Sequence, residues 1–398
     1  MAHGTQMRGH LCGIQTAWTE AGDAAGAVAA VAEILDRAAI GHLIVFFSPA
    51  YEADALAGAL AARFHGVGIT GCSTSGGISP AGSIDRGLVA IAFPRQGFRI
   101  VSGLLTDIAR LDVERAATSV RALRRTLDGG RPDGGNGHRF ALSLIDSFAN
   151  AEETVVSAVA WALDGIPLIG GSAGDDLAFR STVLIHEGQV CREAAVILLV
   201  ETDFPIRIFK SDNFEPTDHK FVVTAAREEE RRVTELNAEP AAREYAMAVG
   251  LDPENLSAMS FAAYPLAVKI GGEYYCRSIS RVEPDGSMTF FCAIGEGVVL
   301  TLAQPRDIVE ATRAELESLD ASLGGLDLVI GFDCVFRRLD AESRQVRHRI
   351  ADLYRRYGVV GFETYGEQYR SMHLNQTFTG IAIGRAEWPA GRPVKRGT

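Results

Sequence analysis

The sequence lacks any uninterrupted apolar run of the roughly 20 residues that a helix needs to cross a bilayer. Residues 1–15 also lack the apolar core of a signal peptide, so we expect a cytoplasmic protein with no membrane partner. Positive charge is scarce, since the formal net charge is -11 and the densest basic run, residues 227–232, contains three glutamates. Nucleic acids are bound by clustered lysine and arginine, so no nucleic-acid partner is expected, and this run predicts a solvated face.

Cysteine pairs with metal-binding spacing are missing too. The six cysteines occur without a C-x-x-C pair, which is typical of reduced, mostly buried thiols rather than of a zinc site or a disulfide framework. No C-x-x-C-H sequence is present, so a haem would be held without thioether bonds. With 398 residues, 47% hydrophobic and 22% charged, the chain has the composition of a soluble globular protein of two or three domains.

One pattern of strand, helix and strand occurs three times. It starts from apolar runs at residues 42–48, 140–147 and 326–334, and each run is followed by apolar residues at the three- and four-residue spacing of a helix. A second strand then leads to a glycine-rich corner, "GCSTSGG", "IGGSAGDD" or "FETYGEQY", and a returning strand. Continuous apolar runs are typical of strands covered on both faces. We therefore predict a mixed α/β (α+β) fold of repeated strand–helix–strand units packed in layers, with chance similarity of common units as the alternative.

The three corners suggest where a ligand would bind. Glycines allow positive φ angles or close backbone approach, so corners brought together would line one or more crevices. The region after the second unit differs, and we place a boundary near residues 202–213. It is expected to hold a charged hairpin, a helix and a second hairpin turning at Pro284–Gly286. The polar, glycine-rich residues 128–137 predict a mobile loop between the first two units.

Several motifs suggest chemistry but lack the context that the chemistry needs. "GGSAG" centres Ser172 in a G-x-S-x-G pattern, yet no helix is predicted after it, so a serine hydrolase is only an outside hypothesis. "GCSTSGG" lacks the lysine of a phosphate-binding loop, and Cys72 within it has no basic neighbour, so a small buried residue is favoured. Asp175 and Asp176 are interpreted as residues that cap a turn and face solvent rather than as cation ligands.

The three corners and the run "MHLNQTFTG" near the end of the chain resemble the FIST domain, a bacterial sensory module in two parts. The resemblance implies an N-terminal segment at 1–29, FIST-N at 30–230, FIST-C at 231–385 and a tail at 386–398. A histidine directly before L-N-Q-T is similar to the NosP subgroup, which implies non-covalent haem b and the sensing of nitric oxide.

The resemblance also implies a receptor with no enzymatic activity of its own. Its partner would be a sensor histidine kinase or a cyclic-di-GMP enzyme, either a diguanylate cyclase or a phosphodiesterase, and it could act as a homodimer. The alternative is a FIST-type receptor for a small metabolite such as an amino acid, without haem.

The resemblance singles out His373 as the axial haem ligand, with His219 as the second candidate. A proximal histidine suits a gas-sensing haem, and nitric oxide weakens the bond to the ligand opposite, so release of His373 would let its corner move. Asn375 would orient the imidazole. The predicted ligand-binding residues are Tyr365, Met372, Asn375 and Thr377, and Phe362, Tyr365 and Tyr369 would suit a porphyrin wall. The alternative for His373 is a turn histidine bonded to the backbone.

Overall fold

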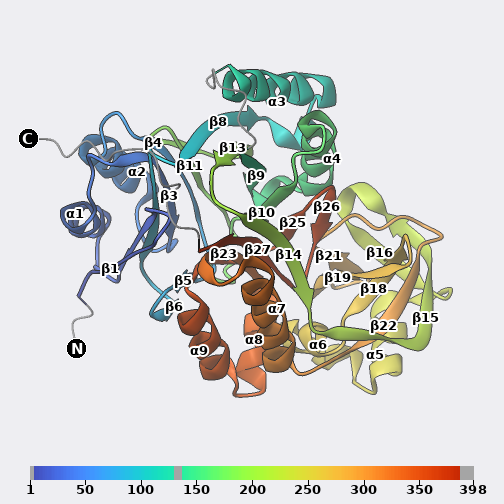
Figure 1. Ribbon diagram of the computed structural model, residues 1–398. Coiled ribbons are helices and arrows are strands. Elements are labelled where there is room, and N and C mark those ends of the chain that lie inside the picture. The colour runs from blue at the N-terminus through green and yellow to red at the C-terminus, as the bar shows by residue number, and fades with distance from the viewer. Residues whose placement is uncertain (1–3, 130–136, 386–398) are drawn as a thin grey trace, which may run out of the picture.

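The computed structural model describes residues 4–129 and 137–385. Three copies of one unit make up most of it, and each copy runs strand, helix, strand, one or two helices, strand, hairpin and returning strand. Figure 1 shows the copies as three lobes around a common centre, with an insert beside the third. The mixed α/β fold of repeated units in layers is therefore confirmed, and the predicted unit is extended by one strand and one helix at its start.

The elements of the three units correspond in order, except that the third unit has two helices between its parallel strands where the others have one. The first unit follows β1 (Gln6–Gly9) and comprises β2 (Gln15–Thr19), α1 (Ala24–Ile34), β3 (Ile40–Phe47), α2 (Ala53–Arg63), β4 (Gly68–Ser73), the hairpin β5 (Gly77–Ser79) and β6 (Gly82–Ile84), and β7 (Leu88–Pro94). The second comprises β8 (Phe98–Thr106), α3 (Val113–Asp128), β9 (His138–Ile145), α4 (Glu152–Leu163), β10 (Leu168–Ser172), the hairpin β11 (Leu184–His186) and β12 (Gln189–Cys191), and β13 (Ala194–Thr202).

The third unit is interrupted by an insert after its first strand. The unit comprises β14 (Ile206–Asp212), α7 (Ile308–Leu323), β23 (Leu326–Cys334), α8 (Val335–Ser343), α9 (Arg347–Tyr357), β24 (Val359–Thr364), the hairpin β25 (Glu367–Tyr369) and β26 (Met372–Leu374), and β27 (Thr377–Gly384). The insert comprises β15 (Phe214–Arg227), β16 (Arg232–Leu236), β17 (Glu239–Pro240), α5 (Ala241–Val249), α6 (Ala258–Ala263), β18 (Leu266–Ile270), β19 (Glu273–Arg277), β20 (Ile279–Val282), β21 (Met288–Phe290) and β22 (Val299–Pro305).

The three units interlock because each one lends its hairpin to the next sheet. In every unit the first and second strands of the predicted pattern pair in parallel (β3 with β4, β9 with β10, β23 with β24), and the returning strand pairs antiparallel. The hairpin does not return to its own sheet. β11–β12 extends the first sheet, β25–β26 extends the second, and β5–β6 extends the third. The exchange is therefore cyclic, and no unit has a complete sheet without another.

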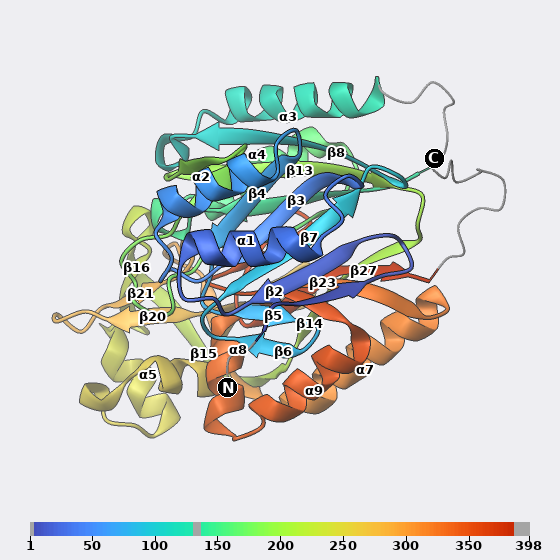
Figure 2. The same cartoon turned by 90° about the vertical axis from the view of Figure 1, so that its left-hand side faces the viewer.

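The core explains why the strands are apolar on both faces. The inner faces of the three sheets meet in one cluster, where the rings of Phe46 and Phe362 lie 4.6 Å apart and Phe332 packs edge-on against Phe362. Helices α1 and α2 cover the outer face of the first sheet, α3 and α4 the second, and α7 and α9 the third (Figure 2). Burial on both faces stabilises each strand by about 25 cal/mol for every Å² of apolar surface removed from water.

The insert confirms most of what its sequence predicts. β20 and β21 form a hairpin that turns at Gly286, whose φ is +81°, and β15, β16 and α5 supply the predicted strands and helix. The insert begins just after Asn213, whose Oδ1 accepts a hydrogen bond from the buried Arg337 at 2.8 Å. Arg337 also donates to Asp333 Oδ1 at 2.6 Å, so the start of the insert is held to the third unit.

The structure bears on three further expectations. Most of the predicted mobile loop at 128–137 lies outside the described residues. All six cysteines are free and five are buried, as predicted. Among the described residues, no helix combines the length and the apolar composition required to span a bilayer.

Candidate functional site

The three glycine-rich corners meet at one place, which we call the junction. It consists of residues 73–76, 172–176 and 363–366, each following the second parallel strand of its unit. Backbone hydrogen bonds join every pair of corners, at 3.0 Å from Gly174 N to Ser73 O, 2.7 Å from Ser172 N to Gly366 O, and 2.8 Å from Glu363 N to Gly76 O. The carboxyl ends of all three parallel pairs therefore converge, which is where α/β sheets usually bind ligands.

The backbones of the corners are in close contact, however. A Cβ atom added at Gly174 would lie 2.3 Å from Ser75 Oγ and 2.8 Å from Ser75 N, so this glycine is needed for close backbone approach. The prediction that the corners themselves line a crevice is therefore wrong, because their glycines bring the three backbones into contact. Any ligand must bind outside the corners, on the surface where they reach the ends of the strands.

That surface is shaped by the loop that leaves the second corner. Asp175 is buried and its carboxylate accepts the backbone N–H groups of Phe179, Arg180 and Ser181 at 2.9, 2.6 and 3.0 Å. The hydroxyl of Tyr365 donates to the same carboxylate. Asp175 thus caps a turn as predicted, but it faces the interior rather than solvent.

The loop is held in a strained conformation. Its residues Asp176, Leu177 and Phe179 have φ angles of +55°, +62° and +50°, which side-chain-bearing residues adopt uncommonly. Leu177 N also donates to the Tyr365 hydroxyl at 2.8 Å. Strain of this kind persists only where surrounding contacts impose it, and it is concentrated at ligand sites.

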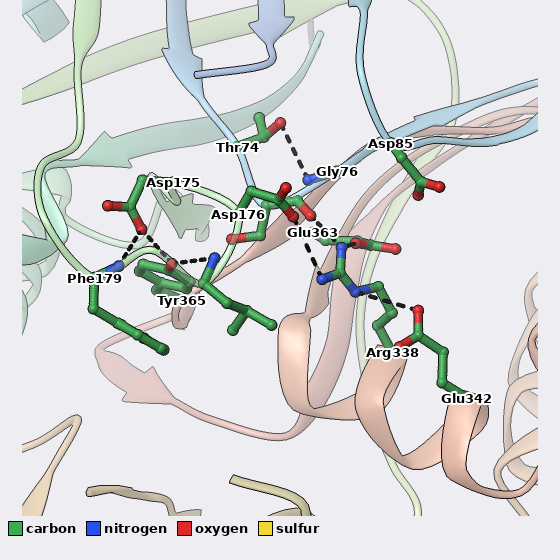
Figure 3. Close-up of polar contacts among 12 residues, drawn as sticks. Thr74, Gly76, Asp85, Asp175, Asp176, Phe179, Arg338, Glu342, Glu363 and Tyr365 are labelled. Atoms are coloured by element: carbon green, nitrogen blue, oxygen red, sulfur yellow. Dashed lines mark hydrogen bonds and ion pairs between the residues drawn. The ribbon is translucent and has the colours of Figure 1, made fainter. Parts of the chain in front are cut away.

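Arg338, on α8, reaches the junction from the third unit (Figure 3). Its Nη1 donates to Ser75 O and, at 2.8 Å, to Glu363 Oε2. The other edge of the guanidinium, formed by Nη2 and the buried Nε, is less firmly held, in a side chain that is 10% exposed. Nη2 lies 3.6 Å from Asp176 Oδ1, Nε lies 3.6 Å from Glu342 Oε1, and Nε has no hydrogen-bond partner in the described part of the chain. This edge has the planar donor geometry that binds carboxylates in pairs of hydrogen bonds.

Aromatic rings cluster around Tyr365 of the third corner. Phe179, which is 39% exposed, stacks on Tyr365 with ring centroids 5.1 Å apart, and Phe148, which is 40% exposed, meets the same tyrosine edge-on at 6.4 Å. Phe291 of the insert packs against Phe179 and Tyr365. The junction therefore presents two partly exposed apolar rings and a half-exposed carboxylate, Asp176, which lies 3.6 Å from Nη2 of the largely buried Arg338.

Glu363 and Glu367 are buried acids within or next to the third corner. Burial raises the pKa of Glu363 to about 7, although Arg338 and Arg347 act in the opposite direction. Burial also raises the pKa of Glu367 to about 8, against the hydrogen bonds from Thr364 and Thr377 that favour the carboxylate.

The predicted ligand-binding residues do not form one group. Tyr365 belongs to the junction through Asp175, whereas Thr377 donates to Glu367 Oε2 at 2.8 Å in the interior. Met372 is half-buried on β26. Asn375 Oδ1 accepts from Ser278 N at 3.4 Å and its amide donates to Tyr365 O, so the prediction that Asn375 orients His373 is wrong.

His373 is buried on β26 with neither ring nitrogen bonded to any described group. Burial lowers its pKa, although the carboxylates of Glu152 and Glu153 oppose that effect. Leaving buried polar atoms without partners costs about 1–3 kcal/mol each, so this imidazole calls for a ligand or a water molecule. The alternative of a turn histidine bonded to the backbone is wrong, since the ring makes no such bond.

One of the charged residues around His373 is Arg231, whose burial the sequence did not predict. Arg231 lies in the run 227–232 that predicts a solvated face, yet it is 4% exposed and pairs with Glu152 and Glu153 at 2.6 Å each. Burial alone would lower the pKa of Arg231, but these two carboxylates raise it above its ordinary value. The prediction of a solvated face is wrong for Arg231, because its guanidinium is buried against the two glutamates at the start of α4 and so joins the insert to that helix.

The remaining candidates do not reach the exposed part of the junction. Ser172 is buried and its Oγ accepts from Gln368 Nε2 at 3.0 Å, and no helix follows it, as predicted. His219 is exposed on β15 with its ring against Phe221. Cys72 is buried, and burial raises its pKa far above the ordinary value of a thiol.

Sequence reasoning missed Arg338, Phe148 and Phe179. Phe148 and Arg338 come soon after the first parallel strand of their units, since β9 ends at Ile145 and β23 at Cys334. Ligand-binding residues are expected at such carboxyl ends. That signal was available once the three repeats had been aligned. Phe179 carries no comparable signal, because its place depends on the strained loop.

Comparison with known proteins places the whole junction within two family domains. Residues 42–239 match the FIST N domain, and residues 241–370 match the FIST C domain. The chain is also 23% identical over 354 residues to an uncharacterized protein of Methanocaldococcus jannaschii, which covers 79% of this chain and 67% of that protein. The first two corners lie in the FIST N match and the third in the FIST C match, so the junction joins both domains.

Proposed function

Since the chain belongs to the FIST domain proteins, whose domains are signal-transduction sensors, we propose that it binds a small molecule on the junction surface and thereby alters a partner signalling protein. One observation carries the proposal. Partly exposed Phe148 and Phe179 pack on Tyr365, and the loop that carries Phe179 also brings half-exposed Asp176 to within 3.6 Å of Arg338, where both domains and the insert meet. A ligand bound there would contact elements from both domains, so its binding could change their arrangement.

The chemistry of the surface favours a small amino acid-like ligand. Arg338 would pair with a carboxylate, Asp176 would move from Arg338 to an ammonium group, and the two phenylalanine rings would cover an apolar side chain. Asp176 is 3.6 Å from the guanidinium, so a carboxylate that makes two hydrogen bonds would replace a weak contact.

The ligand class is tested by calorimetric titration and thermal unfolding with each of the twenty amino acids. At least one should bind saturably to the natural protein, and Arg338→Gln should weaken its binding by tenfold or more. Arg344→Gln is the matched control, because Arg344 ends the same helix and pairs with Asp340 at 2.7 Å. Phe179→Ala, at an exposed ring, should also weaken binding while the protein stays folded. Absence of binding by all twenty would overturn the amino acid proposal.

Haem b and nitric oxide sensing, as in the NosP subgroup, is the second candidate. The unbonded ring nitrogens of His373 favour it, since a neutral imidazole is a common haem ligand. The surroundings as described do not fit a porphyrin. A Cβ at Gly366 would lie 2.2 Å from His373 Cε1, so the ring is in contact with backbone, and ionised side chains of Glu153 and Arg231 face it.

Reconstitution with haem decides between the two candidates. If the second holds, the protein purified with added haem will show a Soret band that shifts with nitric oxide, and His373→Ala will alter it while His219→Ala will not. A protein that binds no haem under these conditions would exclude this candidate. An unaltered spectrum in His373→Ala would exclude His373 as the ligand.

The partner belongs to the same proposal. We expect a cytoplasmic sensor histidine kinase or a diguanylate cyclase or phosphodiesterase, with no reaction catalysed by this chain and with a homodimer as one form of the sensor. Kinase autophosphorylation and cyclic-di-GMP turnover would be measured with and without this protein and its ligand. A ligand-dependent change in either activity supports the proposal, and no change with any kinase or cyclic-di-GMP enzyme from the same genome refutes it.

A further inference from the structure

The outermost strand of the second sheet, β8, has an open edge. It pairs with β13 along all nine of its residues, and no strand lies on its other side in the part of the chain that the structure describes. Residues 99–104 of β8 are half-buried, whereas all of β13 is buried. A groove beside α3 is lined by the consecutive residues 104–106 of β8 and by Arg115 and Ser119. Successive side chains of a strand point to opposite faces, so this groove lies along the edge itself.

The first unit shows how such an edge is covered. Its first strand, β2, corresponds to β8, and β1 pairs antiparallel with β2 from the open side. Residues 16–19 of β2 are buried as a result. The repeated unit therefore has room for one more antiparallel strand beside its first strand. In the second and third units, the same position beside β8 and β14 is open among the described residues.

β8 also lacks the features by which proteins keep an open edge from pairing. Those features are short strands, prolines, bulges and charged side chains. β8 contains no proline, and its register with β13 is unbroken by a bulge. Its one charged residue is Arg99, whose Nη1 lies 3.3 Å from Glu201 Oε1 of β13. β14 is shorter and carries Arg207, Lys210 and Asp212, so β8 is the better suited of the two edges to strand pairing.

We propose that two copies of this chain associate through β8, in an antiparallel register centred on Ser102. This register uses every residue of β8 and places Ile100 opposite Leu104 of the second copy, both on the inner face of the sheet. Arg99 then lies opposite Leu105 of the second copy, so no like charges oppose each other in a chain whose net charge is -11. A second copy is favoured over a strand of another protein because β8 is its own complement in this register, as a twofold interface requires.

The inference deepens the proposed function, because it rests on the homodimer form of the sensor and gives that form an interface. Pairing through β8 would join the second sheets of the two copies into one continuous sheet. β10 belongs to the same sheet, separated from β8 by β13 and β9, and it ends at Ser172 in the second corner. The two junctions of the dimer would therefore be connected through a single sheet.

The test is analytical ultracentrifugation of the full chain at concentrations from about 1 to about 100 μM. The natural protein should become mainly dimeric over this range. Ile100→Lys and Leu104→Glu should each weaken dimerisation by about tenfold or more, because each buries an unpaired charge in the interface. An equimolar mixture of the two variants should recover the dimer, because the new ammonium and carboxylate groups would lie opposite each other. Ile208→Lys, on the open edge of β14, is the matched control and should dimerise like the natural protein. Circular dichroism and thermal unfolding establish that each variant is folded.

Natural protein that stays monomeric at about 100 μM would overturn the proposal. So would a dimer that both folded β8 variants leave intact, or a mixture of them that does not pair. Loss of the dimer in Ile208→Lys alone would place the interface at β14 and would equally overturn it. Amino acid binding at the junction is measured separately by titration, so a monomer that binds an amino acid would refute the interface and leave the proposed ligand site standing.

Discussion

Glu367 gives a prediction that can be worked out from its surroundings. The side chain is fully buried, and burial raises its pKa from 4.5 to about 8. One carboxyl oxygen accepts from Thr364, and the other accepts from Thr377 N at 3.2 Å and Thr377 Oγ1 at 2.8 Å. Glutamine has the shape of the protonated acid. Its carbonyl can accept both bonds from Thr377 and its amide can donate to Thr364, whose hydroxyl then turns to Asp333 O at 3.5 Å.

The pH dependence follows from the raised pKa. Between pH 4.5 and about pH 8 the folded protein holds a proton on Glu367 that the unfolded chain has released. Stability due to this group is therefore fully present below pH 4.5 and is lost as the pH rises through 8. One pKa unit corresponds to about 1.4 kcal/mol, so natural protein should lose roughly 2–4 kcal/mol relative to Glu367→Gln between pH 5 and pH 8. Glu363 titrates in both proteins and cancels from the difference.

Urea unfolding of both proteins at pH 5, 6, 7 and 8 measures this difference. Glu367→Gln should be close to the natural protein at pH 5 and more stable than it at pH 8. Glu317→Gln, at an exposed position of α7, is the control and should follow the natural protein at every pH. Parallel curves for natural protein and Glu367→Gln would refute the reasoning, because they would mean that Glu367 ionises in the folded protein as it does in the unfolded chain.

Three further changes test the packing. Gly174→Ala should destabilise the protein by about 1–3 kcal/mol, since its Cβ would lie 2.3 Å from Ser75 Oγ; an unchanged urea midpoint would contradict the close contact of the corners. Gly58→Ala, in the interior of α2 with no atom within 4 Å of the new Cβ, should stabilise it by about 0.5–1 kcal/mol in the same assay. Arg231→Ala should cost about 3–5 kcal/mol, because it leaves the buried carboxylate of Glu152 unpaired; a loss below 1 kcal/mol would mean that this charge reaches water.

The repeated unit could be predicted from the sequence because each strand and helix shows its own apolar pattern. The exchange of hairpins could not, since pairing such as Gly171 with Glu367 joins segments far apart in the chain and leaves no periodic signal. The first strand and helix of each unit were also not recognised as part of the repeated pattern. They precede the apolar runs that mark the pattern, and in the third unit the insert separates β14 from α7.

The candidate site could likewise be predicted only in part from the sequence. The corners were found because glycine clusters are visible in a sequence, and they do meet. Their purpose was misjudged, because a glycine that permits close packing and a glycine that opens a crevice look alike before the fold is known. Arg231 was misread for a related reason. Its neighbours along the chain are glutamates, whereas its partners, Glu152 and Glu153, lie on another element.

Hydrogen–deuterium exchange of the full chain tests ligand binding at the junction most directly. The protein would be compared with and without the amino acid that binds most tightly, next to Arg338→Gln under the same conditions. Slower exchange is expected in residues 172–182 and 363–366 of the natural protein and not of the variant. Exchange that is unchanged in these segments, or slowed equally in Arg338→Gln, would contradict a ligand site at the junction.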